Sequence, residues 1–260
     1  MQLASRPHSA QIGFSMARLK DVEIAEIWCM DRRGAREEDR RIGGREAARM
    51  QNAGAIIDRH EIGRLLRRYP NLKELHIVTH TGEPGKGCGA MGVIFAAIKK
   101  PEEYAAHGFS KKVNDVLVAP FRKESFSDSE GLERINNEMQ LRNAREVASE
   151  INPELKVTAE SIDLSKLGLQ DYQGRHYLIV AKVSTKSNAE LINKAGAEMG
   201  GTYIVRGFSI SSMIPHIEVA VKGLHISDVR MAKGKGGLSE KEISRIKEFF
   251  RGSDLQFSEF

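Results

Sequence analysis

The chain has 260 residues, of which 40% are hydrophobic and 29% are charged, and its formal net charge is +5 at pH 7. A chain of this length and composition can bury a substantial core, which excludes a disordered or fibrous protein. The sequence has no run that approaches the roughly 18 apolar residues of a membrane-spanning helix. Acidic residues are interleaved with most of the basic pairs, so the charge does not indicate a nucleic-acid surface. We therefore expect neither nucleic acid nor a membrane among the partners.

The two cysteines are too few for a disulfide-stabilised secreted domain, and they indicate a reducing compartment. Residues 1–20 contain basic residues and serines but no acid, which faintly resembles an organellar targeting segment. They lack the apolar stretch of a secretory signal. We predict a cytoplasmic protein in which residues 1–20 form an N-terminal arm.

Hydrophobic periodicity predicts alternating strands and helices over the first hundred residues. An apolar run that ends at Cys29 indicates a strand, and residues 58–69 have the apolar spacing of a helix. Residues 75–79 indicate a second strand, with His80 just past its end, and a glycine-rich loop then precedes a helix at 90–99. This order predicts an α/β fold with a central, mostly parallel β-sheet flanked by helices.

The pattern is weaker in the remainder of the chain, and no internal repeat is evident. Residues 101–130 are charged and irregular, and a capping box at Ser239–Glu242 predicts the start of a last helix. The other expected elements are helices at 131–150 and 189–199 and strands at 155–160, 176–183, 202–206 and 217–222. We expect a domain at 21–183 and a C-terminal α+β extension at 184–260, to which the sequence assigns no role.

Three side chains that bind metals fall near the predicted strand ends or in the loop that follows: Cys29, His80 and Cys88. Ligands of open α/β sheets bind at the carboxyl ends of the strands, so these residues are placed for a common site. Thiolate and imidazole are preferred zinc ligands, and a catalytic zinc keeps three protein ligands and one open position. Asp31 and Arg33 lie close to Cys29, and the arginine would keep the acid ionised by lowering its pKa.

Each of these residues also has an ordinary structural interpretation. A cysteine is often buried as a small hydrophobic residue, and the two cysteines could form a disulfide if no metal binds. Asp31 and Arg33 could be a surface ion pair. We prefer the functional interpretation because both cysteines of the chain fall inside the motifs described next.

Four motifs, taken in order, resemble the β-class carbonic anhydrases. They are Cys29-Met30-Asp31-Arg32-Arg33, Asn52-Ala53-Gly54, His80-Thr81 and Cys88-Gly89-Ala90-Met91. The resemblance is strong over residues 22–100, thin to about 183, and absent beyond. The chain departs from the family pattern between His80 and Cys88, because the family usually has two intervening residues and here seven intervene, from Thr81 to Gly87.

The resemblance implies a zinc enzyme, a lyase of the carbonate dehydratase type. Cys29, His80 and Cys88 would be the zinc ligands, and Asp31 and Arg33 the catalytic pair beside the metal. Hydroxide bound to zinc would convert carbon dioxide reversibly to bicarbonate, with Asp31 orienting it. The family also implies a homodimer or a higher homo-oligomer.

Two other functions remain open at this stage. The same zinc site could hydrolyse carbonyl sulfide or carbon disulfide, as in some relatives, because the metal ligands do not distinguish these substrates. Alternatively, the insertion at Gly82–Gly87 has abolished catalysis, which would leave a zinc-binding or redox-sensing interaction module.

Overall fold

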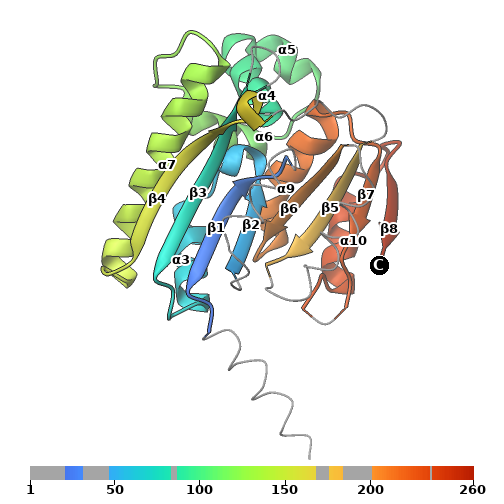
Figure 1. Ribbon diagram of the computed structural model, residues 1–260. Coiled ribbons are helices and arrows are strands. Elements are labelled where there is room, and N and C mark those ends of the chain that lie inside the picture. Colours follow the sequence, from blue (N-terminus) through green and yellow to red (C-terminus); the bar gives the residue numbers. More distant parts are fainter. Residues whose placement is uncertain (1–20, 32–46, 83–86, 168–175, 184–200, 235) are drawn as a thin grey trace, which may run out of the picture.

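The computed structural model describes residues 21–31, 47–82, 87–167, 176–183, 201–234 and 236–260, and all structural statements here concern these residues. They form two four-stranded sheets in which every strand pair is parallel (Figure 1). The strands of the first sheet are β1 (Ile24–Cys29), β2 (Ala47–Asn52), β3 (Glu74–Thr81) and β4 (Lys156–Asp163). Those of the second are β5 (Tyr177–Lys182), β6 (Thr202–Gly207), β7 (Asp228–Met231) and β8 (Gln256–Glu259).

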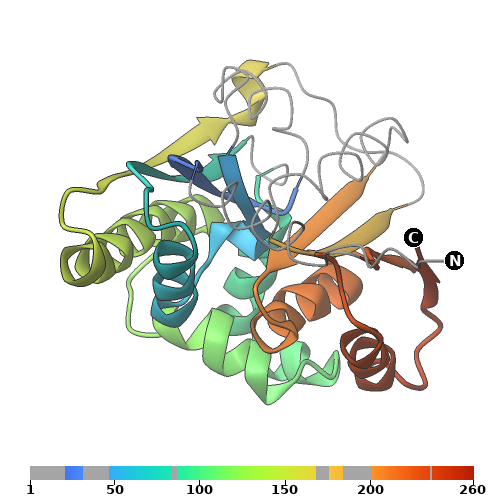
Figure 2. The same cartoon turned by 90° about the horizontal axis from the view of Figure 1, so that it is seen from below.

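Helices flank the two sheets, which confirms the predicted α/β class. The helices are α3 (Arg59–Arg68), α4 (Gly89–Lys99), α5 (Pro101–Ala106), α6 (Lys111–Val113), α7 (Ser129–Ile151), α9 (Ile210–Glu218) and α10 (Glu240–Phe249). Figure 2 shows α3, α7, α9 and α10 on the same side of the strands. Short 3-10 turns occur at Ala53–Ala55, Ala119–Phe121 and Leu164–Leu167, and π-helical turns at Asn114–Val118 and Val219–Gly223.

Two expectations for the later elements are corrected by the structure. Residues 101–130 hold α5, α6 and helical turns in place of an irregular stretch. The strand expected at 217–222 is wrong, because Ser209 caps a helix that begins at Ile210 and runs into this segment. The helix expected at 189–199 lies outside the described residues. The predicted capping box at Ser239 is confirmed at the start of α10.

The two sheets have the same strand order, a repeat that the sequence did not reveal. The first sheet runs β2-β1-β3-β4 and the second β6-β5-β7-β8, so in each the second strand lies outside the first. We call residues 21–167 the first half and residues 176–260 the second half. The equivalent strands β2 and β6 lie next to each other (Figure 1). Ile204 N donates to Met30 O at 3.1 Å, which joins β6 to the residue that follows β1.

The hydrophobic core is continuous across this junction. One buried cluster contains Cys29 and Cys88 from the first half together with Val180, Val205 and Ile217 from the second. A second cluster packs α3 and the later turns of α7 against the first sheet. The residues around Cys29 are therefore covered by both halves of the chain.

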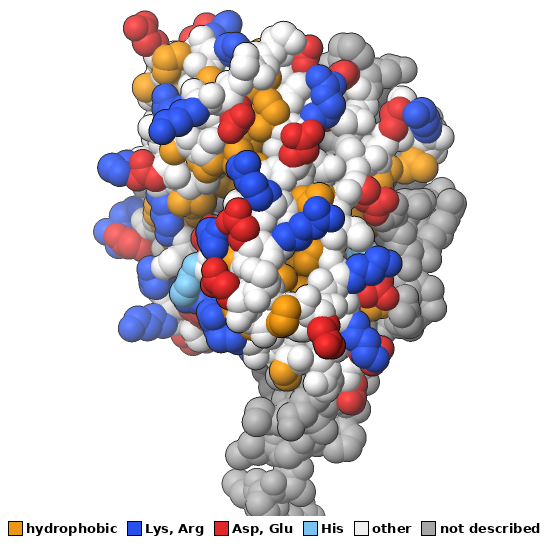
Figure 3. Space-filling view, turned by 90° about the vertical axis from the view of Figure 1, so that its left-hand side faces the viewer, with side chains coloured by type: hydrophobic (Ala, Val, Ile, Leu, Met, Phe, Trp, Pro, Cys, Tyr) orange, Lys and Arg blue, Asp and Glu red, His pale blue; other side chains and the backbone are white. Residues whose placement is uncertain are grey.

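The surface of the first half carries charges of both signs. Figure 3 shows Lys and Arg side chains alternating with Asp and Glu on the face formed by α7 and β4. Among the described helices, none has the length and apolar character needed to cross a membrane.

Gly54 packs the turn after β2 closely against α4 and α7. Its φ of +61° lies in the left-handed region, which favours glycine. A β-carbon at this position would clash with Cε of Met91, three residues beyond Cys88 in the chain. The carbonyl of Gly54 accepts a hydrogen bond from Asn136 Nδ2 at 2.7 Å. A larger residue in this turn therefore requires the Met91 side chain to move.

We predict that Gly54→Ala lowers the free energy of unfolding by about 1–3 kcal/mol, because backbone strain adds to the clash with Met91. The matched control is Gly92→Ala in α4, where a β-carbon would meet no atom within 4 Å. This control should leave stability unchanged or raise it by up to about 1 kcal/mol. Urea unfolding followed by circular dichroism measures both. Equal effects of the two substitutions would contradict the packing argument.

Candidate metal centre

The structure brings the three predicted metal ligands together. Cys29 is the last residue of β1, His80 lies near the end of β3, and Cys88 precedes the first residue of α4. β1 and β3 pair in parallel with Trp28 opposite Val78, so both strands end at the same sheet edge. One donor atom from each of Cys29, His80 and Cys88 lies within 4.8 Å of the other two, and all three residues are buried. This geometry suits a metal ion, and their role as ligands stays a prediction.

The two sulfur atoms are spaced for a shared tetrahedral ion. Cys29 Sγ and Cys88 Sγ are 3.5 Å apart, and both cysteines are free. Two thiolates on one tetrahedral zinc, each at about 2.3 Å, lie about 3.8 Å from each other. A disulfide would instead need about 2.05 Å. The sulfur and imidazole donors favour zinc over magnesium or calcium, and three ligands leave one coordination position open.

The hydrogen bond between the sulfur atoms shifts the pKa values of the two cysteines in opposite directions. It holds the pKa of Cys29 well below its ordinary value, and the nearby charge of His80 acts in the same direction while burial opposes it. The same hydrogen bond raises the pKa of Cys88, and burial adds to that effect. Of the two, Cys29 is thus the more readily deprotonated. A metal ion would displace the proton of Cys88, since thiolates are the ligands.

Asp31 lies beside the three predicted ligands and outside their mutual cluster. Its Oδ2 is 3.9 Å from His80 Nε2, and the residue is 7% exposed. Its backbone forms an antiparallel bridge with Tyr203, so the second half fixes its position. Arg33 lies outside the described residues, and its pairing with Asp31 stays a prediction.

His76, the other histidine of β3, has a structural explanation. Its Nδ1 is 2.7 Å from Thr158 Oγ1 on β4, and its Nε2 is 3.0 Å from Glu74 Oε2. Both ring nitrogens are therefore used within the sheet, and the choice of His80 over His76 is consistent with the geometry.

Glu133 of α7 touches the candidate centre, and the sequence analysis did not identify it. Its Oε1 accepts a hydrogen bond from Cys88 N at 2.9 Å. Its Oε2 is buried and bonds to no other residue in the described ranges. Burial raises the pKa of Glu133 to about 7. One feature of the sequence could have identified Glu133. The helical spacing of Glu133, Asn136 and Gln140 places three polar residues on the buried face of α7.

No protein-family model and no curated protein sequence matches the chain. The solved structures that are similar to it include the following two. One is the β-carbonic anhydrase CafA of the fungal pathogen Aspergillus fumigatus, at 17% identity and a TM-score of 0.37, over 60% of this chain and 77% of that chain. The other is the apo form of a carbon disulfide hydrolase, at 17% identity and a TM-score of 0.35, over 60% and 82%. These values establish no family, so the functional argument rests on the site.

We predict that His80→Gln abolishes stoichiometric zinc binding, because the imidazole is one of three donors. His76→Gln is the matched control on the same strand, and it should keep zinc. Cys88→Ser should behave like His80→Gln. Zinc content of the purified, zinc-equilibrated proteins is measured by inductively coupled plasma mass spectrometry. A full equivalent of zinc in the His80 or Cys88 variant would show that the ligand assignment is wrong.

We also predict that Glu133→Leu weakens zinc binding by about 10- to 100-fold, the usual effect of losing a group that orients a ligand. Glu133→Gln keeps an oxygen acceptor for Cys88 N and should lose less. Glu138→Leu, on the exposed side of the same helix, serves as the control and should bind zinc normally. Competition with a chromophoric chelator gives the affinities. If Glu133→Leu matches the control, Glu133 does not position Cys88.

Proposed function

We propose that the chain is a zinc enzyme that converts carbon dioxide reversibly to bicarbonate. The proposal is carried by the buried cluster of Cys29, His80 and Cys88, with Asp31 beside it at the carboxyl ends of β1 and β3. A structural zinc site is closed by four protein ligands, whereas three ligands with an adjacent acid are the arrangement of a catalytic site. A homo-oligomer, implied by the sequence resemblance, is part of the same proposal.

Each side chain around the cluster would have a separate role in such a reaction. Zinc held by the three ligands would lower the pKa of a bound water toward about 7, which supplies a nucleophile at neutral pH. Asp31 would accept a hydrogen bond from the reacting water and hold its lone pair toward the substrate. Arg33 would pair with Asp31, and Glu133 would hold Cys88 through its backbone N–H.

The surroundings of the cluster suit a small, uncharged substrate. Met30, Ala90 and Met91 are buried in the same hydrophobic cluster as Cys29 and Cys88. Carbon dioxide needs no charged group to bind it, and an apolar lining strengthens the electrostatic interactions at the metal. Carbonyl sulfide and carbon disulfide share these properties, so they are the substrates against which the proposal is tested.

We predict that zinc-replete protein hydrates carbon dioxide at a rate that rises with pH between about 6.5 and 9. This range is expected because zinc-bound water, with a pKa of about 7, loses its proton there. Asp31→Asn should keep its zinc and lose about 100-fold or more in rate, because the neutral amide oxygen is a weaker hydrogen-bond acceptor for the reacting water than the carboxylate. Asp163→Asn is the control, since Asp163 also ends a strand of the first sheet but bonds to Ser165. Stopped-flow indicator assays give the rates.

A zinc-replete protein without a rate above buffer would contradict the carbon dioxide assignment. The same samples are then offered carbonyl sulfide and carbon disulfide, with release of hydrogen sulfide as the readout. Turnover of either would identify a zinc hydrolase. A protein that binds zinc and turns over none of the three would be a non-catalytic zinc module.

A further inference from the structure

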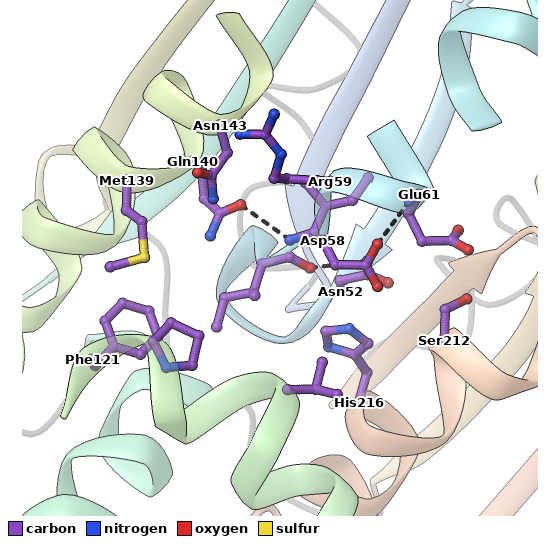
Figure 4. A pocket seen from close by; sticks show the side chains of 14 residues that line it. Asn52, Asp58, Arg59, Glu61, Phe121, Met139, Gln140, Asn143, Ser212 and His216 are labelled. Atoms are coloured by element: carbon purple, nitrogen blue, oxygen red, sulfur yellow. Dashed lines mark hydrogen bonds between the residues drawn. The ribbon is translucent and has the colours of Figure 1, made fainter. Parts of the chain in front are cut away.

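A cavity of about 210 Å³ lies apart from the three predicted metal ligands, and none of them lines it. The first half contributes the turn after β2, the start of α3 and one face of α7, while α9 of the second half completes the cavity (Figure 4). Phe121 and Met139 form an apolar wall. Asn52 and His216 lie across from this wall, and both are at least nine-tenths buried. The cavity therefore combines apolar surface with two placed polar groups.

His216 presents a hydrogen-bond donor to the cavity. Its Nδ1 accepts a hydrogen bond from Ala53 N at 3.0 Å, so a neutral ring carries its proton on Nε2. Burial lowers the pKa of His216 to about 3, which keeps the ring neutral at physiological pH. Within the described part of the chain, Nε2–H has no hydrogen-bond acceptor.

Asn52 lines the cavity beside His216 and carries a buried acceptor. Its Nδ2 donates to Ile56 O at 3.1 Å, whereas its Oδ1 is buried and receives no hydrogen bond from any described residue. The ring of His216 and the amide of Asn52 are neighbours because His216 is bonded to Ala53, the next residue in the chain. A buried acceptor that lacks a partner is unfavourable until a ligand or water supplies one.

The charges around the cavity do not suit an anion or a metal ion. Asp58 and Glu61 both line it, and Glu61 Oε2 is a further buried acceptor that has no hydrogen bond from the described residues. The lining cation, Arg59, is paired with Glu146 and Glu150 of α7. Asp58 Oδ1 already accepts from Glu61 N at 2.8 Å as the cap of α3, and His216 Nε2 carries a proton.

We propose that this cavity binds a small, uncharged organic molecule that carries a primary amide or an equivalent group. The amide N–H donates to Asn52 Oδ1, its carbonyl accepts from His216 Nε2–H, and a compact apolar group packs on Phe121 and Met139. An amide offers a donor and an acceptor on adjacent atoms, whereas a carboxylate offers no donor and an ammonium no acceptor. The proposal does not depend on the metal centre or on its reaction.

The test uses the full chain labelled with ¹⁵N-histidine and three probes of similar size: benzamide, benzoate and benzylamine. Titration followed by NMR should give a saturable shift of the His216 Nε2 signal with benzamide and no saturable shift with the other two. His216→Asn assigns the signal, because its Oδ1 can replace Nδ1 as the acceptor for Ala53 N. This variant lacks the Nε2–H donor and should not bind benzamide.

A substitution that fills the cavity provides the second arm of the test. Val116 lines the cavity, and Val116→Phe should weaken benzamide binding by at least about tenfold, equivalent to 1.4 kcal/mol. Val221→Phe is the matched control, since Val221 is also half-buried in a π-helical turn but does not line the cavity. It should bind benzamide as the unmodified chain does. Circular dichroism establishes that each variant is folded.

Three results would overturn the proposal. The first is equal binding of benzamide and benzoate, which would mean that the amide is not recognised. The second is benzamide binding that Val116→Phe leaves unchanged, which would place the ligand elsewhere. The third is no benzamide binding by the unmodified chain, which would mean that water alone satisfies Asn52 and His216.

Discussion

The parallel register of β1 and β3 is the constraint on which the candidate metal centre depends. With Trp28 opposite Val78, Cys29 lies one residue and His80 two residues beyond this pair, at the same edge of the sheet, and their donor atoms lie within 4.8 Å of each other. A slip of one residue would turn the side chains of one strand to the other face of the sheet. Cys88 reaches the same point by another route, because Glu133 of α7 holds its backbone N–H where α4 begins. Two predicted ligands thus depend on the sheet and the third on a helix.

The second half repeats the strand order of the first but serves as a support. Its strand β5 is the equivalent of β1 and ends at Lys182, and both cysteines of the chain lie in the first half. The second half supplies supporting contacts and none of the three predicted metal ligands. Tyr203 bridges the backbone of Asp31, and His216 accepts from Ala53 in the turn after β2. These contacts hold residues that flank the candidate metal centre, and the two halves share one hydrophobic cluster in the same part of the fold.

The sequence could reveal the parts of the site whose chemistry is local. Cys29 and Asp31 lie two residues apart, and His80 lies near the end of a strand that its own apolar residues define. The contacts that support them could not be predicted, because Ala53 and His216 are 163 residues apart and Cys88 and Glu133 are 45. The segment 217–222 was mistaken for a strand for a physical reason. A helix buried on most of its surface, as α9 is, loses the polar face that would mark its period.

One face of α7 connects the candidate metal centre to the cavity between the halves. Glu133 accepts from Cys88 N, Asn136 donates to Gly54 O, and Gln140 accepts from Ile57 N at 3.2 Å. Each such bond contributes about 0.5–1.5 kcal/mol, and losing a buried partner costs about 1–3 kcal/mol, so the three contacts reinforce a single geometry. The turn that follows Asn52 is therefore held by the same helix that holds Cys88. A candidate centre supported in this way is preformed around its donor atoms, and the three predicted ligands would need little rearrangement to receive an ion.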